Sequence, residues 1–400
     1  MPRAPGPMFA LALASVALIG PLAVHLFLPV IPAIKVALDL PDSTAQATFS
    51  IALIGMAVAT LFYGTLADRF GRRPVLLSGL LLFLAGSALS FAAPTVGLLI
   101  AGRFVQALGA GCGITLVRAI ARDAYGPERL VKAIAYLTMF YTLGPMIAPI
   151  AGGMLVDAYG WRSAFGFSLF GGTLILLGAW LAIYETRPVA SGPIGGQSVL
   201  GGYVALFSNL RFSCFVFQTG FNTGAFLVVA SGASFLMKEV LRRPATEYGL
   251  WFLTFPFGFF FGNFVSSRVG TRAAIETMVL LGSLLSLATV AILSGLLVAG
   301  FINPPVIFVS GFFITFAQGI ALPYGQAGAM AVNPKLAGTA SGIGACMQNL
   351  IAALFTQLYG LLADGTVWPL VIAAGTSSVF GLICGVLPWR QARAGERARL

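Results

Sequence analysis

The chain has 400 residues, of which 58% are hydrophobic and 9% are charged, and its formal net charge is +11. Soluble domains carry about 25% charged residues because water must wet their surface. This composition therefore excludes a soluble protein and makes lipid the expected solvent. A net charge of +11 is also typical of nucleic-acid binding, but the positions of the basic residues favour membrane topology as its cause.

Twelve apolar stretches of about 20 residues follow one another along the chain. A helix rises about 1.5 Å per residue, so each stretch can cross a hydrocarbon core of ~30 Å. We therefore predict an all-α membrane protein with 12 transmembrane helices. The stretches cover residues 8–32, 45–66, 73–92, 96–119, 133–156, 162–184, 210–237, 245–267, 273–298, 304–331, 337–361 and 366–388.

The basic residues predict the orientation of these helices. With the N-terminus in the cytoplasm, most Lys and Arg fall on the cytoplasmic side, which is the usual bias of membrane proteins. We therefore expect both termini in the cytoplasm and the protein in a bacterial inner membrane. The first stretch is interpreted as a retained helix, because it has no convincing small-residue cleavage site. The opposite side holds Lys35, Arg162, Lys238, Arg242 and Arg243.

The chain divides into two halves. A segment rich in Gly, Pro and Ser follows the sixth stretch, and the loop 64–73 reappears in degraded form 199 positions later, at 263–272. Transporters are commonly built from such repeats, with the binding site near the midplane between them. We predict a six-helix bundle over 1–187, a cytoplasmic linker over 188–208, a second six-helix bundle over 209–389 and a basic cytoplasmic tail over 390–400.

His25 and Arg103 are the candidate coupling residues inside the first and fourth stretches. A buried arginine costs roughly 2.5–3.5 kcal/mol on insertion scales, so we expect Arg103 to act in coupling or in the electrostatics of a cavity. The alternative is that it reaches the outer headgroups. His25 is the only histidine, and its imidazole titrates near neutral pH. It can hold the coupling proton, bind substrate without titrating, or be a structural histidine.

The loop after the second stretch is a candidate conformational latch. Its glycines allow a tight turn between two helices, and its carboxylate at the bilayer edge needs a positive partner. A contact present in only one conformation would hold that conformation. The alternative is that the arginines only anchor the topology. The residues are Gly64, Asp68, Arg69, Gly71, Arg72 and Arg73.

The fifth stretch carries small residues and prolines at intervals of four. Such spacing forms a smooth helix face on which another backbone can slide or bend. We expect a pliant seam that governs closure and limits ion leak, and ordinary small-residue packing is the alternative. One face holds Gly144, Ala148 and Gly152, and the other holds Pro145, Pro149 and Gly153.

Neutral amides lie at similar depth in several stretches. A buried amide in lipid is costly unless it is paired or faces a wet cavity. We predict that these amides line a shared substrate chamber together with tyrosines and an apolar phenylalanine wall, although pairwise bonding between helices can account for some of them. The candidates are Gln106, Tyr136, Tyr141, Gln218, Asn222, Phe255, Gln318, Gln348 and Asn349.

Several of these motifs resemble one family. The loop Gly64–Pro74 is similar to the signature loop of the major facilitator superfamily, and Arg103–Gly109 resembles its fourth-helix motif. The segment Gly144–Gly153 resembles the fifth-helix motif associated with antiport. Other segments are similar to the bicyclomycin/chloramphenicol-resistance branch of drug:proton antiporters, namely Arg118–Asp123, Glu185–Thr186 and Gly338–Gly342 with Gln348.

This resemblance implies two pseudo-symmetric bundles that work by alternating access. It also implies that Arg118 belongs to the latch and that Asp123 takes part in coupling. The branch usually has an acid where His25 stands, and none of the 12 acids lies clearly inside a stretch. The usual carboxylate-based proton coupling is therefore in doubt.

Two transport functions remain open. The first is proton-coupled export of drug-like or amphipathic molecules. The second is transport of one metabolite, such as an amino acid, sugar or siderophore, in either direction and with or without proton coupling, in which Arg103 can bind a carboxylate. An enzyme or an ATP-driven pump is not expected, because the chain has no GxxxxGK[ST], HExxH or clustered Cys/His/Asp set. We expect no cofactor, metal or nucleic acid, and a monomer with protons and a small molecule as partners.

Overall fold

The computed structural model describes residues 5–187 and 199–397, and within these ranges the chain is α-helical with no strand. Twelve helical spans are long and apolar enough to cross a membrane, which confirms the predicted fold class. The spans are Pro7–Ala37, Asp42–Phe70, Arg72–Ala92, Val96–Gly126, Lys132–Tyr159, Arg162–Ala182, Leu210–Val240, Ala245–Arg272, Ile275–Val298, Pro304–Val332, Ala337–Leu362 and Trp368–Ala394.

The first span is broken into four pieces. They are α1 (Pro7–Ala17), α2 (Ile19–Val24), the 3-10 helix η1 (His25–Val30) and α3 (Ile31–Ala37). Proline lacks an N–H group and clashes with the preceding turn. Prolines at 21, 29 and 32 therefore prevent one continuous α-helix here. His25 is the first residue of the 3-10 piece.

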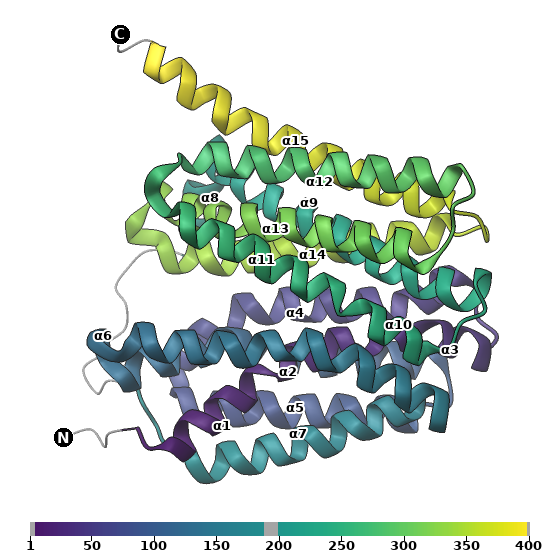
Figure 1. Ribbon diagram of the computed structural model, residues 1–400. Helices are drawn as coiled ribbons and strands as arrows, with labels where there is room; N and C mark the ends of the chain where they lie inside the picture. Colours follow the sequence, from purple (N-terminus) through teal and green to yellow (C-terminus); the bar gives the residue numbers. More distant parts are fainter. Residues whose placement is uncertain (1–4, 188–198, 398–400) are drawn as a thin grey trace. The chain divides into compact units, whose positions relative to one another are not determined.

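The next five spans are formed by four helices. These are α4 (Asp42–Phe70), α5 (Arg72–Ala92), α6 (Val96–Tyr159) and α7 (Arg162–Ala182), which Figure 1 labels. The long α6 contains both the fourth and the fifth span. It is interrupted at Gly126, where φ is 65° and ψ is 174°. Glycine tolerates this positive φ because it has no Cβ.

The remaining helices form the second half of the chain. They are α8 (Val199–Phe207), α9 (Leu210–Phe235), the π-helical turn η2 (Leu236–Val240), α10 (Ala245–Phe252), α11 (Thr254–Val269) and η3 (Gly270–Arg272), followed by α12 (Ile275–Val298), α13 (Pro304–Val332), η4 (Pro334–Leu336), α14 (Ala337–Leu362) and α15 (Trp368–Arg397). The final helix continues into the segment predicted as the basic tail.

The chain separates into two compact units. Unit 1 comprises residues 1–196 with 244–250, and unit 2 comprises 197–243 with 251–400. The short α10 is thus divided, with its first residues in unit 1. In the predicted linker, 188–198 lie outside the described residues, and 199–207 form the helix α8.

Small residues let the helices of each unit approach closely. A Cβ added to Gly102 of α6 would lie 2.8 Å from the backbone nitrogen of Ser90 in α5. In unit 2, a Cβ added to Gly319 of α13 would lie 2.5 Å from the carbonyl oxygen of Phe259 in α11. No methyl group fits at such distances, so these positions require glycine. Close backbone contact of this kind is the main source of helix packing in lipid.

The two copies of the repeated loop share one backbone feature. Gly71 joins α4 to α5 with φ of 98°, and Gly270 follows α11 with φ of 53°. Both values lie in the left-handed region that favours glycine. The second and third spans of each half are therefore joined through a glycine of the same kind, as the repeat leads one to expect.

Candidate coupling and substrate sites

Arg103 is buried in unit 1, where it joins three spans. Its side chain is 1% exposed, and its guanidinium donates to the carbonyls of Ala23 and Thr48 at 3.0 and 3.1 Å. It also donates to the side-chain oxygen of Gln106 at 2.5 Å and lies 3.9 Å from the centroid of the Phe27 ring. All of these partners are neutral. The alternative that Arg103 reaches the headgroups is therefore wrong, because its charge is held inside the bundle.

The broken first span explains why a carbonyl is available to Arg103. Ala23 lies in the last turn of α2, where carbonyls lose their α-helical donors. In lipid such a group must find another partner. Gln106 extends the network, because its amide nitrogen donates to the Ser87 hydroxyl at 2.8 Å. Gln106 is fully buried in this network.

His25 lies in the segment of the first span that contacts Arg103. Ala23 and Phe27 contact Arg103, and His25 stands midway between them. The side chain of His25 is half-buried. The structure thus brings the segment around His25 to Arg103 through Ala23 and Phe27.

The predicted seam of the fifth span packs closely inside unit 1. A Cβ on Gly144 would clash with Pro21, and one on Gly152 would clash with the Leu26 carbonyl. Ala148, on the same face, is buried. This face therefore rests on the prolines and the 3-10 turn of the first span.

The other face of the seam contacts the start of α10, which also belongs to unit 1. A Cβ on Gly153 would clash with the carbonyl of Ala245, and one on Gly249 would lie 2.5 Å from the carbonyl of Pro149. Four residues after Gly153, the Asp157 carboxylate accepts from the backbone N–H groups of Ala245 and Thr246 at 3.1 and 2.8 Å. It also accepts from the Thr246 hydroxyl at 2.7 Å. Asp157 was not among the sequence candidates, because its partners are 88 and 89 residues away.

The loop between α4 and α5 contains a network of charges. The buried Arg72 guanidinium pairs with Asp68 at 2.8 Å and with Asp123 at 2.9 Å. Asp123 therefore belongs to this loop cluster and not to the region around His25. Arg118 is exposed, and among the described residues no carboxylate pairs with it. The latch candidates are thus divided, with Arg72 at the centre.

Glu185 completes the loop cluster. Its carboxylate accepts from the backbone N–H groups of Arg72 and Arg73 at 2.9 and 3.1 Å, at the start of α5. It also accepts from the N–H groups of Thr186 and Arg187. Burial raises the pKa of Glu185, but these four backbone bonds outweigh it and hold the pKa below its ordinary value. An anion at a helix N-terminus is stabilising, so Glu185 fixes the start of the third span.

The turn leaves room for this carboxylate because Gly71 has no side chain. A Cβ at Gly71 would lie 2.6 Å from Oε2 of Glu185. The glycine is thus required twice, by its positive φ and by the approach of Glu185. In the sequence, Glu185 was noted only within a family-like dipeptide. The signal available in the sequence was an acidic residue directly after the sixth span, whose helix ends near the loop between α4 and α5.

Thr223 joins three spans of unit 2. Its hydroxyl oxygen accepts from the amide nitrogens of Gln318 and Gln348, both at 2.9 Å, and the hydroxyl donates to the Thr219 carbonyl. Gln318 lies on α13 and Gln348 on α14. Two of the predicted chamber amides are therefore together, through a threonine that the sequence analysis did not single out. Gln348 is half-buried, so part of it is accessible.

Gln218 and Asn222 form a separate group inside unit 2. Gln218 donates to the Ser283 hydroxyl of α12 at 2.9 Å. Asn222 lies next to Gly381 of α15, and neither atom of its amide has a hydrogen-bond partner among the described residues. The amides of unit 2 thus divide between α12 and α15 on one side and α13 and α14 on the other.

The other chamber candidates differ in their surroundings. Phe255 is buried in an aromatic cluster, with its ring centroid 4.8 Å from that of Phe252 and 5.6 Å from that of Phe226. Asn349 donates to Ala345 within its own helix. Tyr136 and Tyr141 are exposed on α6. These four candidates therefore have different surroundings, and a chamber shared by all nine candidates stays a prediction.

The chain matches one protein family over most of its length. Residues 13–356 match the model of the Major Facilitator Superfamily. The chain is 27% identical to Multidrug resistance protein D of Escherichia coli K12 over 351 residues, or 86% of each chain. It is 25% identical to the Bicyclomycin resistance protein homolog of Haemophilus influenzae over 379 residues, or 94% of each chain.

The chain is also similar to a third relative and to two solved structures. Multidrug resistance protein MdtL of Escherichia coli is 27% identical over 375 residues, or 93% of this chain and 84% of that one. A peptide transporter in complex with sulfate matches 97% of this chain and 95% of its own with a TM-score of 0.76 at 16% identity. A D-xylose-proton symporter matches 96% and 97% with a TM-score of 0.74 at 14% identity. These two structures share the fold.

Proposed function

Because the chain belongs to the Major Facilitator Superfamily, we propose that it exports drug-like or amphipathic molecules in exchange for protons by alternating access. The observation that carries this proposal is the match to relatives named for multidrug or bicyclomycin resistance, each over 86% or more of this chain. A likeness over 86–94% of the chain covers both halves and the loops between spans. It therefore favours a common mode of transport.

The polar contacts of the substrate are assigned to unit 2. Thr223 accepts from both Gln318 and Gln348, so its lone pairs are occupied. The two amide oxygens accept no bond from another described residue and are left for a ligand's donor groups. Neutral amides favour weakly polar substrates over a dedicated cation. The same role is proposed, with less structural support, for Asn349, Tyr136 and Tyr141.

The proton is assigned to His25. Its imidazole is the one histidine side chain of the sequence, and it lies where the first span is broken. Arg103 positions this segment through the Ala23 carbonyl and Phe27. Asp123 acts through Arg72 and the loop cluster, which we assign to conformational coupling. Protonation of His25 would then alter the segment that rests on Gly144 and Gly152.

The proposed setting is a bacterial inner membrane with both termini in the cytoplasm and the protein as a monomer. The basic residues of the loop 69–73 and of the tail support this orientation. Cysteine labelling of the loop around Asp68 and of the C-terminal helix in intact cells tests it. Labelling of either position from the periplasm would contradict the proposed topology.

Expression in a pump-deficient bacterium tests the function. We expect raised resistance to several amphipathic drugs, and substrate uptake by inverted vesicles that collapses when the pH gradient is dissipated. His25→Gln is expected to abolish uphill uptake while leaving exchange down a substrate gradient. Undiminished uphill uptake by His25→Gln, with the usual pH dependence, would remove His25 as the proton site. Transport of one metabolite with no resistance would overturn the export proposal.

The alternative of a metabolite transporter finds no support at Arg103. A carboxylate substrate would need access to the guanidinium, but Arg103 is 1% exposed and its donors are engaged by oxygens of three spans. The structure therefore favours a positioning role for this residue. An Arg103→Lys variant keeps the charge but loses the planar fork. We expect it to lower uphill uptake more than substrate binding.

A further inference from the structure

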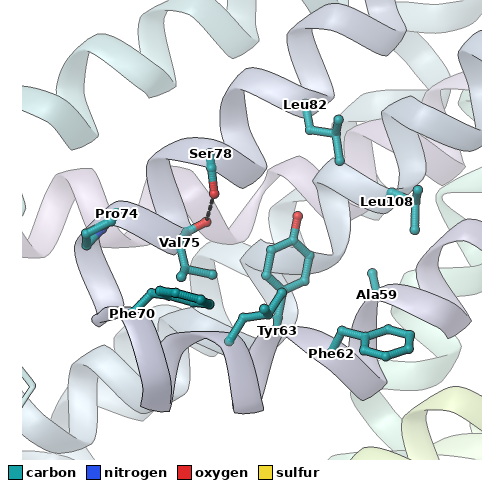
Figure 2. Close-up of a pocket in the computed structure, with 10 residues that line it drawn as sticks. Ala59, Phe62, Tyr63, Phe70, Pro74, Val75, Ser78, Leu82 and Leu108 are labelled. Atoms are coloured by element: carbon teal, nitrogen blue, oxygen red, sulfur yellow. Dashed lines mark hydrogen bonds between the residues drawn. The ribbon is translucent and has the colours of Figure 1, made fainter.

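A groove of about 550 Å³ lies within unit 1 between α4 and α5. Both helices pack on α6, which forms the floor with Leu108, while Tyr63 closes the groove from α4 (Figure 2). The rim on α4 is made of Phe62 and Phe70, each 58% exposed. The opposite rim on α5 includes Leu82. The groove is thus a recess with a buried floor and exposed apolar edges.

Of the ten side chains that line the groove, those of Tyr63 and Ser78 carry a hydroxyl and the other eight are apolar. Its hydroxyl on α5, that of Ser78, donates to the Val75 carbonyl of its own helix at 3.0 Å (Figure 2). This bond turns the hydroxyl back to its own backbone. The surface therefore suits a hydrocarbon chain and not a polar solute.

The length of the groove matches one leaflet. From Phe70 to Ala59 along α4 the helix rises about 16 Å, and from Pro74 to Leu82 along α5 it rises about 12 Å. Half of a hydrocarbon core of ~30 Å is ~15 Å. The groove therefore begins at the loop between α4 and α5 and ends near the middle of the bilayer.

One arginine at the start of the groove is available for an anion. Arg72 is engaged by Asp68 and Asp123, and Arg73 donates to the Trp180 carbonyl at 2.8 Å. Arg69 is exposed, and no carboxylate of the described chain pairs with it. Its guanidinium carbon lies 5.1 Å from the centroid of the Phe70 ring, which lines the groove. The charge thus lies directly at the mouth.

We propose that this groove binds the acyl chain of an anionic phospholipid whose phosphate is held by Arg69. Basic pockets between helices at a membrane surface commonly hold anionic headgroups. An ordinary lipid at the protein surface would need neither the recess nor the charge. The assignment to the cytoplasmic leaflet rests on the proposed topology, whereas the binding itself does not depend on transport.

Native mass spectrometry of the purified full-length protein tests the proposal. The protein in detergent is offered phosphatidylglycerol or phosphatidylcholine with identical acyl chains. We expect one phosphatidylglycerol to be retained about five-fold more strongly, the factor expected for one arginine near a membrane surface. Arg69→Gln should abolish this preference. Equal retention of the two lipids by the unmodified protein would overturn the proposal.

A matched pair of variants locates the lipid. Ser78→Phe fills the groove, whereas Ala85→Phe adds the same ring to an exposed position of α5 outside it. We expect Ser78→Phe to lose the retained phosphatidylglycerol and Ala85→Phe to keep it. Equal retention by both variants would overturn the proposal. So would a changed substrate KM with unchanged lipid retention in Ser78→Phe, which would assign the groove to the substrate.

A measurement without any variant keeps the test decisive if Ser78→Phe does not fold. Phosphatidylglycerol with a photoreactive group in its acyl chain is cross-linked to the unmodified protein in vesicles. We expect the cross-links to concentrate in 59–82 of α4 and α5. An even distribution over all spans would contradict a defined site. Loss of transport with intact cross-linking would refute only the proposed function.

Discussion

Replacement of Gly152 by alanine tests how closely the fifth span rests on the first. An added Cβ would lie 2.1 Å from the carbonyl oxygen of Leu26 and 3.2 Å from Cγ of Pro29. Ordinary contacts of a Cβ begin near 3.4 Å, so one helix must move by roughly 1 Å. Overpacking of this size costs about 1–3 kcal/mol. A gain of about 1 kcal/mol in helix propensity partly offsets it.

Gly178→Ala is the matched control. Gly178 also lies inside a helix, but an added Cβ would meet no atom within 4 Å. The gain in helix propensity is the same for both variants and cancels in their difference. We therefore expect Gly152→Ala to be about 1–3 kcal/mol less stable than Gly178→Ala. The free energy of unfolding is measured in mixed micelles by titration with a denaturing detergent.

The same pair distinguishes the seam from ordinary packing. If the face of Gly152 must slide on the first span, its variant should lose uphill uptake in vesicles while Gly178→Ala keeps it. Equal stability of the two variants would refute the close approach. Lower stability with full transport would leave the packing argument and remove the proposed role of the seam.

Three further predictions concern single polar groups. The pKa of Glu185 is depressed in the folded protein, so its stabilising contribution is present at neutral pH and is lost as the pH falls through that pKa. Glu185→Gln should therefore unfold at a lower temperature than the unmodified protein at pH 7, and the two unfolding temperatures should converge in acid. A difference that stays constant with pH would contradict this. Asn222→Leu should change the free energy of unfolding by less than Gln318→Leu does. The reason is that the Asn222 amide has no hydrogen-bond partner among the described residues, whereas Gln318 donates to Thr223. The reverse order of the two free energies in micelle titrations would refute this prediction. Asp157→Ala should cost about 0.5–2 kcal/mol, because the carboxylate caps α10, and an unchanged unfolding midpoint would show that the cap contributes nothing.

The fold was predictable from the sequence because hydropathy and length decide which segments can enter lipid. The twelve predicted spans all appear, whereas the break of the first span into four pieces was not predicted, although its prolines at 21, 29 and 32 explain it. The tight turn at Gly71 also followed from its residue type. These features depend on residues that are close in sequence.

The sites were less predictable because their contacts join distant residues. Depth along each span placed Gln218 and Gln318 at one level but could not predict the direction of their side chains. Gln218 of α9 bonds to Ser283 of α12, whereas Gln318 of α13 bonds to Thr223 of α9. Rotation of a helix about its axis is set by packing, which hydropathy does not report. For the same reason Arg103 was correctly identified as unusual while its neutral partners were not foreseen.

The neutral surroundings of Arg103 have a consequence for ion permeation. A guanidinium stays protonated at any physiological pH, and no acid among the described residues lies within hydrogen-bond distance to cancel its charge. Its field is poorly screened in a medium of low dielectric constant. The first bundle therefore contains a fixed positive potential that repels hydronium and metal cations. In a transporter of the proposed kind, such a barrier would help to preserve the membrane potential during turnover.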